Sequence, residues 1–151
     1  MPVSPELRQQ IIDFYAQQFG IPESFLDGLL IETNKEEVWG ATGSLLPGIY
    51  SARAVGLRIC RNFHGGFKPT SVFLAALGPL VSRSRIDVEL DDLRSLLMGQ
   101  RIAYSGSEAG YVALVYQGDI LGCGRCHDGK LHALIPTGRR RELLEILAPH
   151  L

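Results

Sequence analysis

The stretch GYVALVYQGDILGCGRCHDGKLHALIP, residues 110–136, decides the fold of the second half of the chain. Three apolar runs separated by glycine-containing pairs follow one another: 111–117, 120–127 and 130–135. Gly118-Asp119 suits a type II′ turn, and Asp128-Gly129 is the usual signal of a type I′ hairpin. The pattern therefore predicts a meander of three antiparallel strands.

Helix signals lie on both sides of this meander. Before it, a short strand over 85–90 leads into a helix that begins at the acidic pair Asp91-Asp92 and ends at Gly99. After it, Thr137 is expected to cap a last helix over 138–147, whose leucines recur at three- and four-residue steps. The second half is therefore predicted to be a small β-rich domain.

The first half begins with a clear helix. Ser4 and Pro5 open an amphipathic helix over 5–19, which Gly20 can end in the left-handed region. Further expected elements follow along the chain: a helical turn at 22–24, strands at 29–32 and 37–41, one or two strands within 49–60, a loop at 62–66, and a helix from 69–71 to 78–79. We predict an α+β protein with a boundary near residue 85, so that a small α/β domain over 1–85 precedes the β-rich domain over 86–151.

Composition limits the class of protein. The 151 residues are 46% apolar and 21% charged, which suits one ordinary domain or two small ones. No apolar run approaches the roughly 20 residues of a membrane-spanning helix, and the residues after Met1 show no export signal. Three cysteines are too few for a disulfide scaffold. We expect a cytoplasmic protein with reduced thiols and no membrane partner.

Charge is unevenly distributed, although the net charge is only -1. Residues 1–37 hold two basic residues against seven acidic ones, whereas 38–86 hold six basic residues and no acidic one. Within this basic segment we name Arg58, Arg61 and Lys68 as candidate RNA contacts. A solvated face without a partner would explain the same pattern.

Three consecutive arginines, Arg139, Arg140 and Arg141, stand in the first turn of the predicted last helix. Cations at the positive end of a helix dipole are unfavourable by a few tenths of a kcal/mol each, so helix stability does not explain them. Contact with phosphate would, and exposed arginines on a solvated turn are the alternative.

The sequence Cys123-Gly-Arg-Cys126-His127 matches the C-x-x-C-H pattern of haem attachment. In a strand, however, Cys123 and Cys126 point to opposite faces, and Cys123 and His127 lie about 13 Å apart. A zinc site built from these residues, with His132 or with Cys60 and His64, would need four convergent ligands. We expect no metal and no cofactor, and packing of small semi-apolar residues explains the cysteines.

Other chemistry is not indicated. No catalytic triad, acid pair or nucleotide-binding glycine motif is present, so we predict no catalytic residue. Trp39, Tyr111 and Tyr116 are expected to pack in the core or across strands, and stacking on a nucleic-acid base is the alternative for them.

The C-terminal half resembles the PUA-like RNA-binding module. The residues that carry this resemblance are the strand and Leu-Gly-x-Gly over 110–124, Asp-Gly-Lys-Leu at 128–131, and Ile-Pro-Thr-Gly-Arg-Arg at 135–140. The variant is similar to those of the Nip-seven ribosome-biogenesis family and of Nop/Sun-type RNA cytosine-5 methyltransferases. Ala-Val-Gly-Leu-Arg at 54–58 and Phe-Lys-Pro-Thr-Ser at 67–71 resemble the small α/β domain that precedes this module there.

The resemblance implies a PUA-like mixed β-barrel that binds structured rRNA or tRNA without catalysing a reaction, in RNA maturation or ribosome biogenesis. Carried over by position, it implies RNA contacts at Gly99, Arg101, Lys130, Arg139 and Arg140. An RNA methyltransferase or a ribosome-assembly factor is a further expected partner. The alternatives are an adaptor that docks on such a protein through its acidic first segment, and a haem or zinc protein that uses the cysteine motif.

Overall fold

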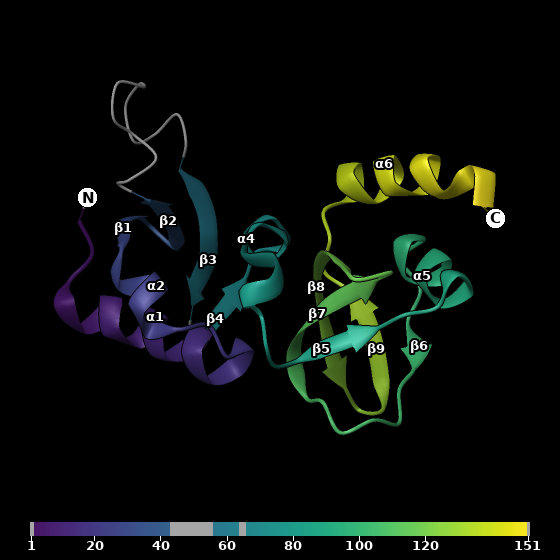
Figure 1. The fold of residues 1–151 in the computed structure, drawn as a ribbon, viewed down its shortest axis with the longest axis horizontal. Coiled ribbons are helices and arrows are strands. Elements are labelled where there is room, and N and C mark those ends of the chain that lie inside the picture. Colours follow the sequence, from purple (N-terminus) through teal and green to yellow (C-terminus); the bar gives the residue numbers. More distant parts are fainter. Residues whose placement is uncertain (1, 43–55, 64–65, 151) are drawn as a thin grey trace. The chain divides into compact units, whose positions relative to one another are not determined.

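The computed structural model describes residues 2–42, 56–63 and 66–150. The chain divides into two compact units, Met1–Arg83 and Ser84–Leu151, and each is described by itself (Figure 1). Predictions that fall on 43–55 and on His64-Gly65 lie outside the described residues.

The first unit contains four strands in one antiparallel sheet of order β1-β2-β3-β4. Its elements are α1 (Pro5–Phe19), α2 (Glu23–Asp27), β1 (Leu29–Asn34), β2 (Glu37–Thr42), β3 (Leu57–Phe63), β4 (Gly66–Pro69), α4 (Ser71–Leu77) and the 3₁₀ turn η2 (Gly78–Leu80). The helix predicted over 5–19 is confirmed, with the Ser4 hydroxyl accepting from Leu7 N–H and Gly20 at φ 70°. The loop predicted at 62–66 is wrong, because Asn62 continues β3 and pairs with Phe67 of β4.

One face of this sheet packs against α1. The helix buries Ile11, Tyr15 and Phe19, and the Tyr15 hydroxyl donates a hydrogen bond to the carbonyl of Ile59. Aromatic contacts from α1 to the edge strand and to α4 extend the core, and they are Phe14 with Phe67 and Tyr15 with Phe73. The register shifts between Val38 and Trp39, which leaves Ile59 as a bulge. Both Ile59 and Cys60 are therefore buried although they are adjacent in one strand.

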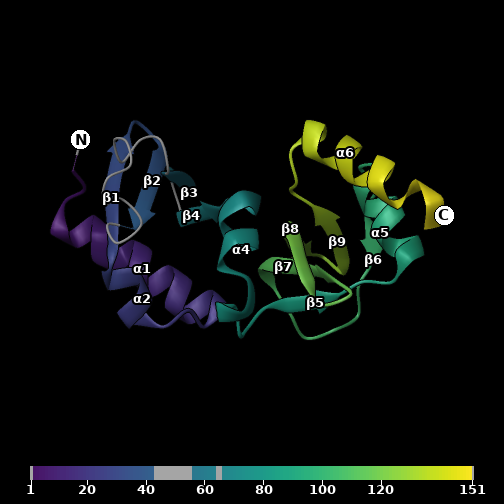
Figure 2. The same ribbon diagram turned by 45° about the horizontal axis from the view of Figure 1, so that its top comes forward.

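The second unit is a curled five-stranded sheet with two helices that lie side by side in both views (Figures 1 and 2). Its elements are β5 (Arg85–Asp87), α5 (Leu90–Leu97), β6 (Ile102–Ala103), β7 (Gly110–Tyr116), β8 (Asp119–His127), β9 (Lys130–Ala133), α6 (Thr137–Leu147) and the 3₁₀ turn η3 (Ala148–His150). The strand order is β5-β7-β8-β9-β6, and only the pairing of β5 with β7 is parallel. The α+β class and the three-strand meander are confirmed.

The turns of the meander depart from the prediction at one end. Asp128 and Gly129 have φ of 51° and 73°, which fits the predicted type I′ hairpin. The first turn is not Gly118-Asp119, because Tyr116 pairs with Asp119 and leaves Gln117-Gly118 as the loop. Both loop residues have positive φ, so this turn also has the type I′ pattern, which matches the right-handed twist of the strands.

Two predicted boundaries around the meander are also corrected. The strand predicted over 85–90 ends at Asp87, and α5 already begins at Leu90. Thr137 does not cap α6 but is its first residue, and Pro136 is the N-cap without a side-chain hydrogen bond. The Thr137 hydroxyl instead accepts a hydrogen bond from Arg140.

The inner face of the curled sheet forms the core of the second unit. Leu114 and Val112 of β7, Cys126 of β8 and Leu131 of β9 are buried there with leucines of α5 and α6. A Cβ atom at Gly124 would lie 2.9 Å from Leu114 Cδ2, so only glycine leaves room for this leucine. The packing of the core therefore explains the second glycine of the Leu-Gly-x-Gly motif.

Candidate nucleic-acid interface

A row of polar and aromatic side chains crosses the outer face of the second sheet. The antiparallel register places Arg125 of β8 opposite Tyr111 of β7 and opposite His132 of β9. Directly opposed residues share a face, and this face is opposite to the one that holds Val112 and Cys126. Arg101 extends the row, because it precedes Ile102 of β6, which pairs with Leu131.

A second, shorter row lies next to the first. His127 pairs with Lys130, and Lys130 pairs with Ala103 of β6. His127 and Lys130 are exposed, and His127 Nε2 lies 3.1 Å from Asp128 Oδ2. We call the two rows together the outer face of the second unit, consisting of Arg101, Tyr111, Arg125, His127, Lys130 and His132.

The cations of the outer face are largely uncompensated. Arg101 and Lys130 are exposed and make no side-chain hydrogen bond or ion pair within the described ranges 2–42, 56–63 and 66–150. The Arg125 guanidinium lies 5.7 Å from the centre of the Tyr111 ring, a cation–π contact that keeps its charge available. Because neighbouring strands are about 4.8 Å apart, Arg125 and Arg101 stand roughly 10 Å apart across the sheet.

The three arginines of α6 have different surroundings. Arg140 donates to the carbonyls of Ile135 and Leu97, at 3.1 and 3.4 Å, and so ties α6 to the end of α5. Arg139 pairs with Glu142 at 3.0 Å, and Arg141 is exposed. The Arg140 guanidinium is thus engaged inside the unit, whereas Arg141 is presented to solvent.

Gly99 allows the backbone to turn between the end of α5 and the start of β6. Its φ is 86°, and a Cβ atom there would lie 2.9 Å from Arg140 Nη1. The following residue, Gln100, donates its N–H to Ser95 at the end of α5. Gly99 therefore reverses the chain so that Arg101 enters the edge of the sheet.

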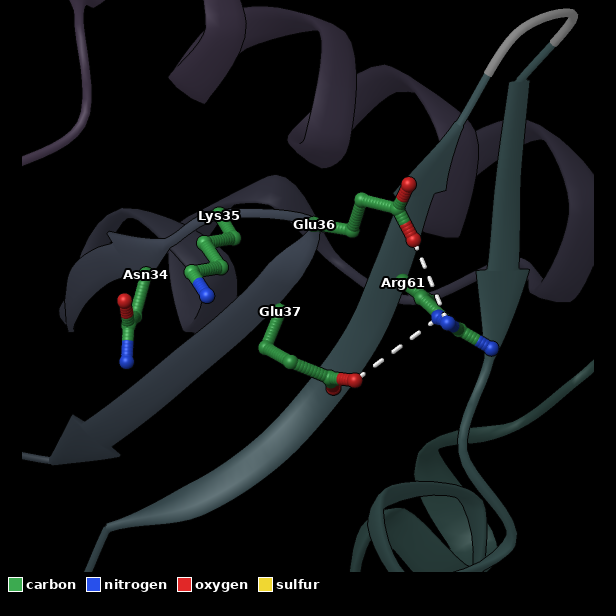
Figure 3. A pocket seen from close by; sticks show the side chains of 5 residues that line it. All are labelled: Asn34, Lys35, Glu36, Glu37 and Arg61. Carbon is green, nitrogen blue, oxygen red and sulfur yellow. Dashed lines mark ion pairs between the residues drawn. The ribbon is translucent and has the colours of Figure 1, made fainter.

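Two of the three predicted contacts of the first unit, Arg58 and Arg61, are compensated by acids. Arg58 Nη1 lies 3.2 Å from Glu37 Oε2, and Arg61 lies 3.2 Å from Glu36 and 3.7 Å from Glu37. Figure 3 shows Arg61 between these two carboxylates, at a hollow of about 320 Å³ that Asn34 and Lys35 complete. Lys68 stands opposite Arg61 on β4.

Glu37 also acts on a buried thiol below it. Its Oε2 is shielded from solvent and makes no aligned hydrogen bond, so the contact with Arg58 is mainly Coulombic. Burial of Cys60, and then the charge of Glu37, raise the pKa of that thiol from 9.0 to about 12. Cys60 is therefore a protonated core residue at neutral pH.

The cysteine motif of β8 is divided between two faces. Cys123 pairs with Ala113 and Cys126 with Gly110, and both thiols are buried while His127 is exposed. Burial, and then the charge of Glu108, raise the pKa of Cys126. Across the described part of the chain, no three His, Cys, Asp or Glu residues are grouped so that they could hold a metal ion.

The sequence named two members of the outer face, Arg101 and Lys130, as RNA contacts, and gave stacking on a base as the alternative for Tyr111. It did not indicate Arg125, His127 or His132 as RNA contacts. Their signal was the two-residue period of the predicted meander, which places Arg125 with His127 and Lys130 with His132 on one side of the sheet.

None of the helices in the described segments is long and apolar enough to span a bilayer. Residues 83–141 match the family model of the methyltransferase RsmF PUA domain. Ribosomal RNA small subunit methyltransferase F of Psychromonas ingrahamii (strain DSM 17664 / CCUG 51855 / 37) is 24% identical over 144 residues, which cover 90% of this chain and 28% of that protein. The chain thus spans little more than a quarter of the length of this curated relative. Residues 83–141 are therefore similar to the PUA domain of an RNA methyltransferase, and most of the chain is similar to part of such an enzyme.

Proposed function

We propose that the protein binds structured RNA, in the maturation of ribosomal RNA, through the outer face of its second unit. The observation that carries this proposal is the row of Tyr111, Arg125 and His132 across three strands, with Arg101 directly before the fourth strand. Two guanidiniums about 10 Å apart can each contact a phosphate, and the ring supports one of them. A helical RNA is recognised mostly by its shape and backbone, which suits a fixed row of cations on a sheet.

The comparisons support the RNA class of this ligand. The matched family model is a PUA domain of a methyltransferase, and the name of the curated relative says that it acts on small-subunit ribosomal RNA. We propose that this chain contributes binding and not methyl transfer. Its two units are built on an antiparallel sheet and a small curled sheet, whereas cofactor-binding folds of the doubly wound kind use a larger parallel sheet.

The remaining predicted contacts differ in how directly we propose that they act on the RNA. Arg139 and Arg141 of α6 contact phosphates at the margin of the bound RNA. Arg140 and Gly99 are positioning residues, because they hold the turn that leads to Arg101. Arg58 and Arg61 add little to the long-range attraction, since acids neutralise them, and Lys68 contributes a single charge.

Salt dependence of binding tests the proposal directly. The full chain is titrated with a hairpin of small-subunit ribosomal RNA between about 50 and 200 mM KCl, because each phosphate contact adds roughly 0.7 to 0.9 to the slope of log K against log salt. Arg101→Ala and Arg125→Ala are each expected to weaken binding about fivefold and to lower that slope by nearly one.

The matched control is Lys35→Ala, which removes the same charge from an exposed turn of the first unit. It is expected to leave the slope unchanged. If both outer-face variants behave like Lys35→Ala, the outer face does not bind the RNA backbone and the proposal is wrong.

A further inference from the structure

The exposed face of the first unit carries the only tryptophan of the chain at its centre. Trp39 lies on β2 between Glu32 of β1 and Arg58 of β3, and its side chain is 44% exposed. The neighbours of Trp39 in β2, Val38 and Gly40, face the buried side. Of the two places expected for Trp39, the core is therefore wrong, and Trp39 lies on the exposed face opposite residues of both neighbouring strands.

Charge on this face is divided about the indole ring. On the β1 side stands the carboxylate of Glu32, and on the β3–β4 side stand Arg58 and Lys68. The side chains of Glu32 and Lys68 make no hydrogen bond or ion pair within the described residues. An aromatic surface thus has a free acceptor at one edge and cations at the other.

These three features match the three parts of one kind of ligand. A base stacks on an indole, a phosphate binds an ammonium or guanidinium group, and a carboxylate accepts hydrogen bonds from adjacent N–H groups. Guanine presents two such donors side by side on its Watson–Crick edge, N1–H and the N2 amine. Adenine presents an acceptor at N1, which a carboxylate repels.

We propose that this face binds an unpaired guanosine nucleotide of RNA. The base stacks on Trp39, its Watson–Crick edge meets Glu32, and its phosphate lies on the β3–β4 side toward Lys68, which has no acidic partner among the described residues. This site lies in the other unit and does not depend on the outer face of the second unit. It reads a base, whereas the outer face contacts the backbone.

The compensation of the nearby arginines agrees with such a role. Because Glu36 and Glu37 neutralise Arg61 and Arg58, the face attracts a polyanion only weakly by charge. Discrimination then depends on stacking and on hydrogen bonds to the base, which unpaired nucleotides in loops and bulges expose.

Trp39 itself reports on the test, because the chain has no other tryptophan. The full chain is titrated with the pentaribonucleotides UUGUU, UUAUU and UUIUU, where I is inosine, and tryptophan fluorescence is recorded. Stacking quenches the signal, and UUGUU is expected to bind about tenfold more tightly than UUAUU. Inosine keeps N1–H but lacks the N2 amine, so UUIUU is expected to fall between them.

Two substitutions separate the parts of the site. Glu32→Gln keeps the shape of the side chain and the stacking but replaces the anionic acceptor, so the preference for UUGUU over UUAUU is expected to fall below about twofold. With a fluorescently labelled UUGUU, Trp39→Phe is expected to bind within about fivefold of the natural chain, and Trp39→Ala to lose tenfold or more. Leu30→Ala, at another exposed apolar position of the same face, is the matched control.

The outcomes distinguish this site from the outer face. The double variant Arg101→Ala/Arg125→Ala is expected to leave the quenching by UUGUU unchanged, even if binding of the ribosomal hairpin is lost. The proposal is overturned if iodide quenches Trp39 while none of the pentanucleotides does so at millimolar concentration. It is equally overturned if Glu32→Gln retains the full preference for guanine.

Discussion

The exposed faces of the two sheets are built from the same residue types but differ in how their charges are balanced. In the first unit, Arg58 and Arg61 are held by Glu36 and Glu37. In the second unit, Arg125 rests on a tyrosine ring, and Arg101 and Lys130 are unpaired among the described residues. The cross-strand partner of an arginine, more than the number of arginines, thus decides whether a sheet presents charge to a ligand.

RNA affinity should change most when the arginines of the outer face of the second unit are neutralised, and far less when those of the first unit are. Arg101→Gln/Arg125→Gln should weaken binding of a ribosomal RNA hairpin about thirtyfold, since each lost phosphate contact costs roughly 1 kcal/mol or more. Arg58→Gln/Arg61→Gln should change it less than about threefold, because acids already screen those charges. Equal losses in filter-binding or anisotropy titrations would remove the distinction between the two faces.

The buried thiol of the first unit predicts a dependence of stability on pH, because burial, and then the charge of Glu37, raise the pKa of Cys60. Cys60 is protonated in the fold up to a pKa of about 12, against 9.0 for an ordinary thiol. Its contribution is fully present below pH 9 and is lost between pH 9 and 12, at up to about 1.4 kcal/mol per pH unit. Urea unfolding at several pH values should show a smaller alkaline decrease for Cys60→Ala than for the natural chain, and parallel curves would contradict this account.

Removing the Glu37 carboxylate should leave an uncompensated arginine on the exposed face of the first unit, as on the outer face of the second. Glu37→Gln frees Arg58 and leaves Arg61 with Glu36 alone, so RNA affinity should rise about threefold with a steeper salt slope. The same change should lower the pKa of Cys60, although burial keeps it above the ordinary value. Glu23→Gln removes an equal charge from the exposed surface of α2 and should do neither.

The smallest expected effect concerns the ring beneath Arg125. Tyr111→Leu should weaken RNA binding about two- to threefold, because an exposed cation–π contact is worth about 0.5 to 1 kcal/mol. Tyr111→Phe keeps the ring face and should stay close to the natural affinity. A comparable loss in both variants, measured under one salt condition, would assign the effect to the hydroxyl.

Elements with local signals were predictable from the sequence, and elements that depend on distant pairing were not. The Ser4 cap and the Asp128-Gly129 turn depend only on residues that are adjacent in the sequence, and both are confirmed. The short strands β4 and β6 and the bulge at Ile59 have no such signal, because they exist only through pairing with strands elsewhere in the chain.

The same division applies to the candidate site. Arg101 and Lys130 were named from a resemblance, whereas Arg125 and His132 required the register of β8 with β9. Arg140 looks in the sequence like its neighbours Arg139 and Arg141. Its bond to the carbonyl of Leu97, a residue far away in the chain, is what separates it from them.

Gly124, whose missing side chain makes room for Leu114, has a consequence for recognising relatives of this protein. A glycine conserved for that reason would identify chains whose sheet curls in the same manner. It would carry no information about which ligand they bind. The alternate positions 125, 127, 130 and 132 lie on the opposite face from the core that Gly124 and Leu114 share. Sorting relatives by the charge at those outward positions should therefore separate modules that bind RNA from modules that share only the fold.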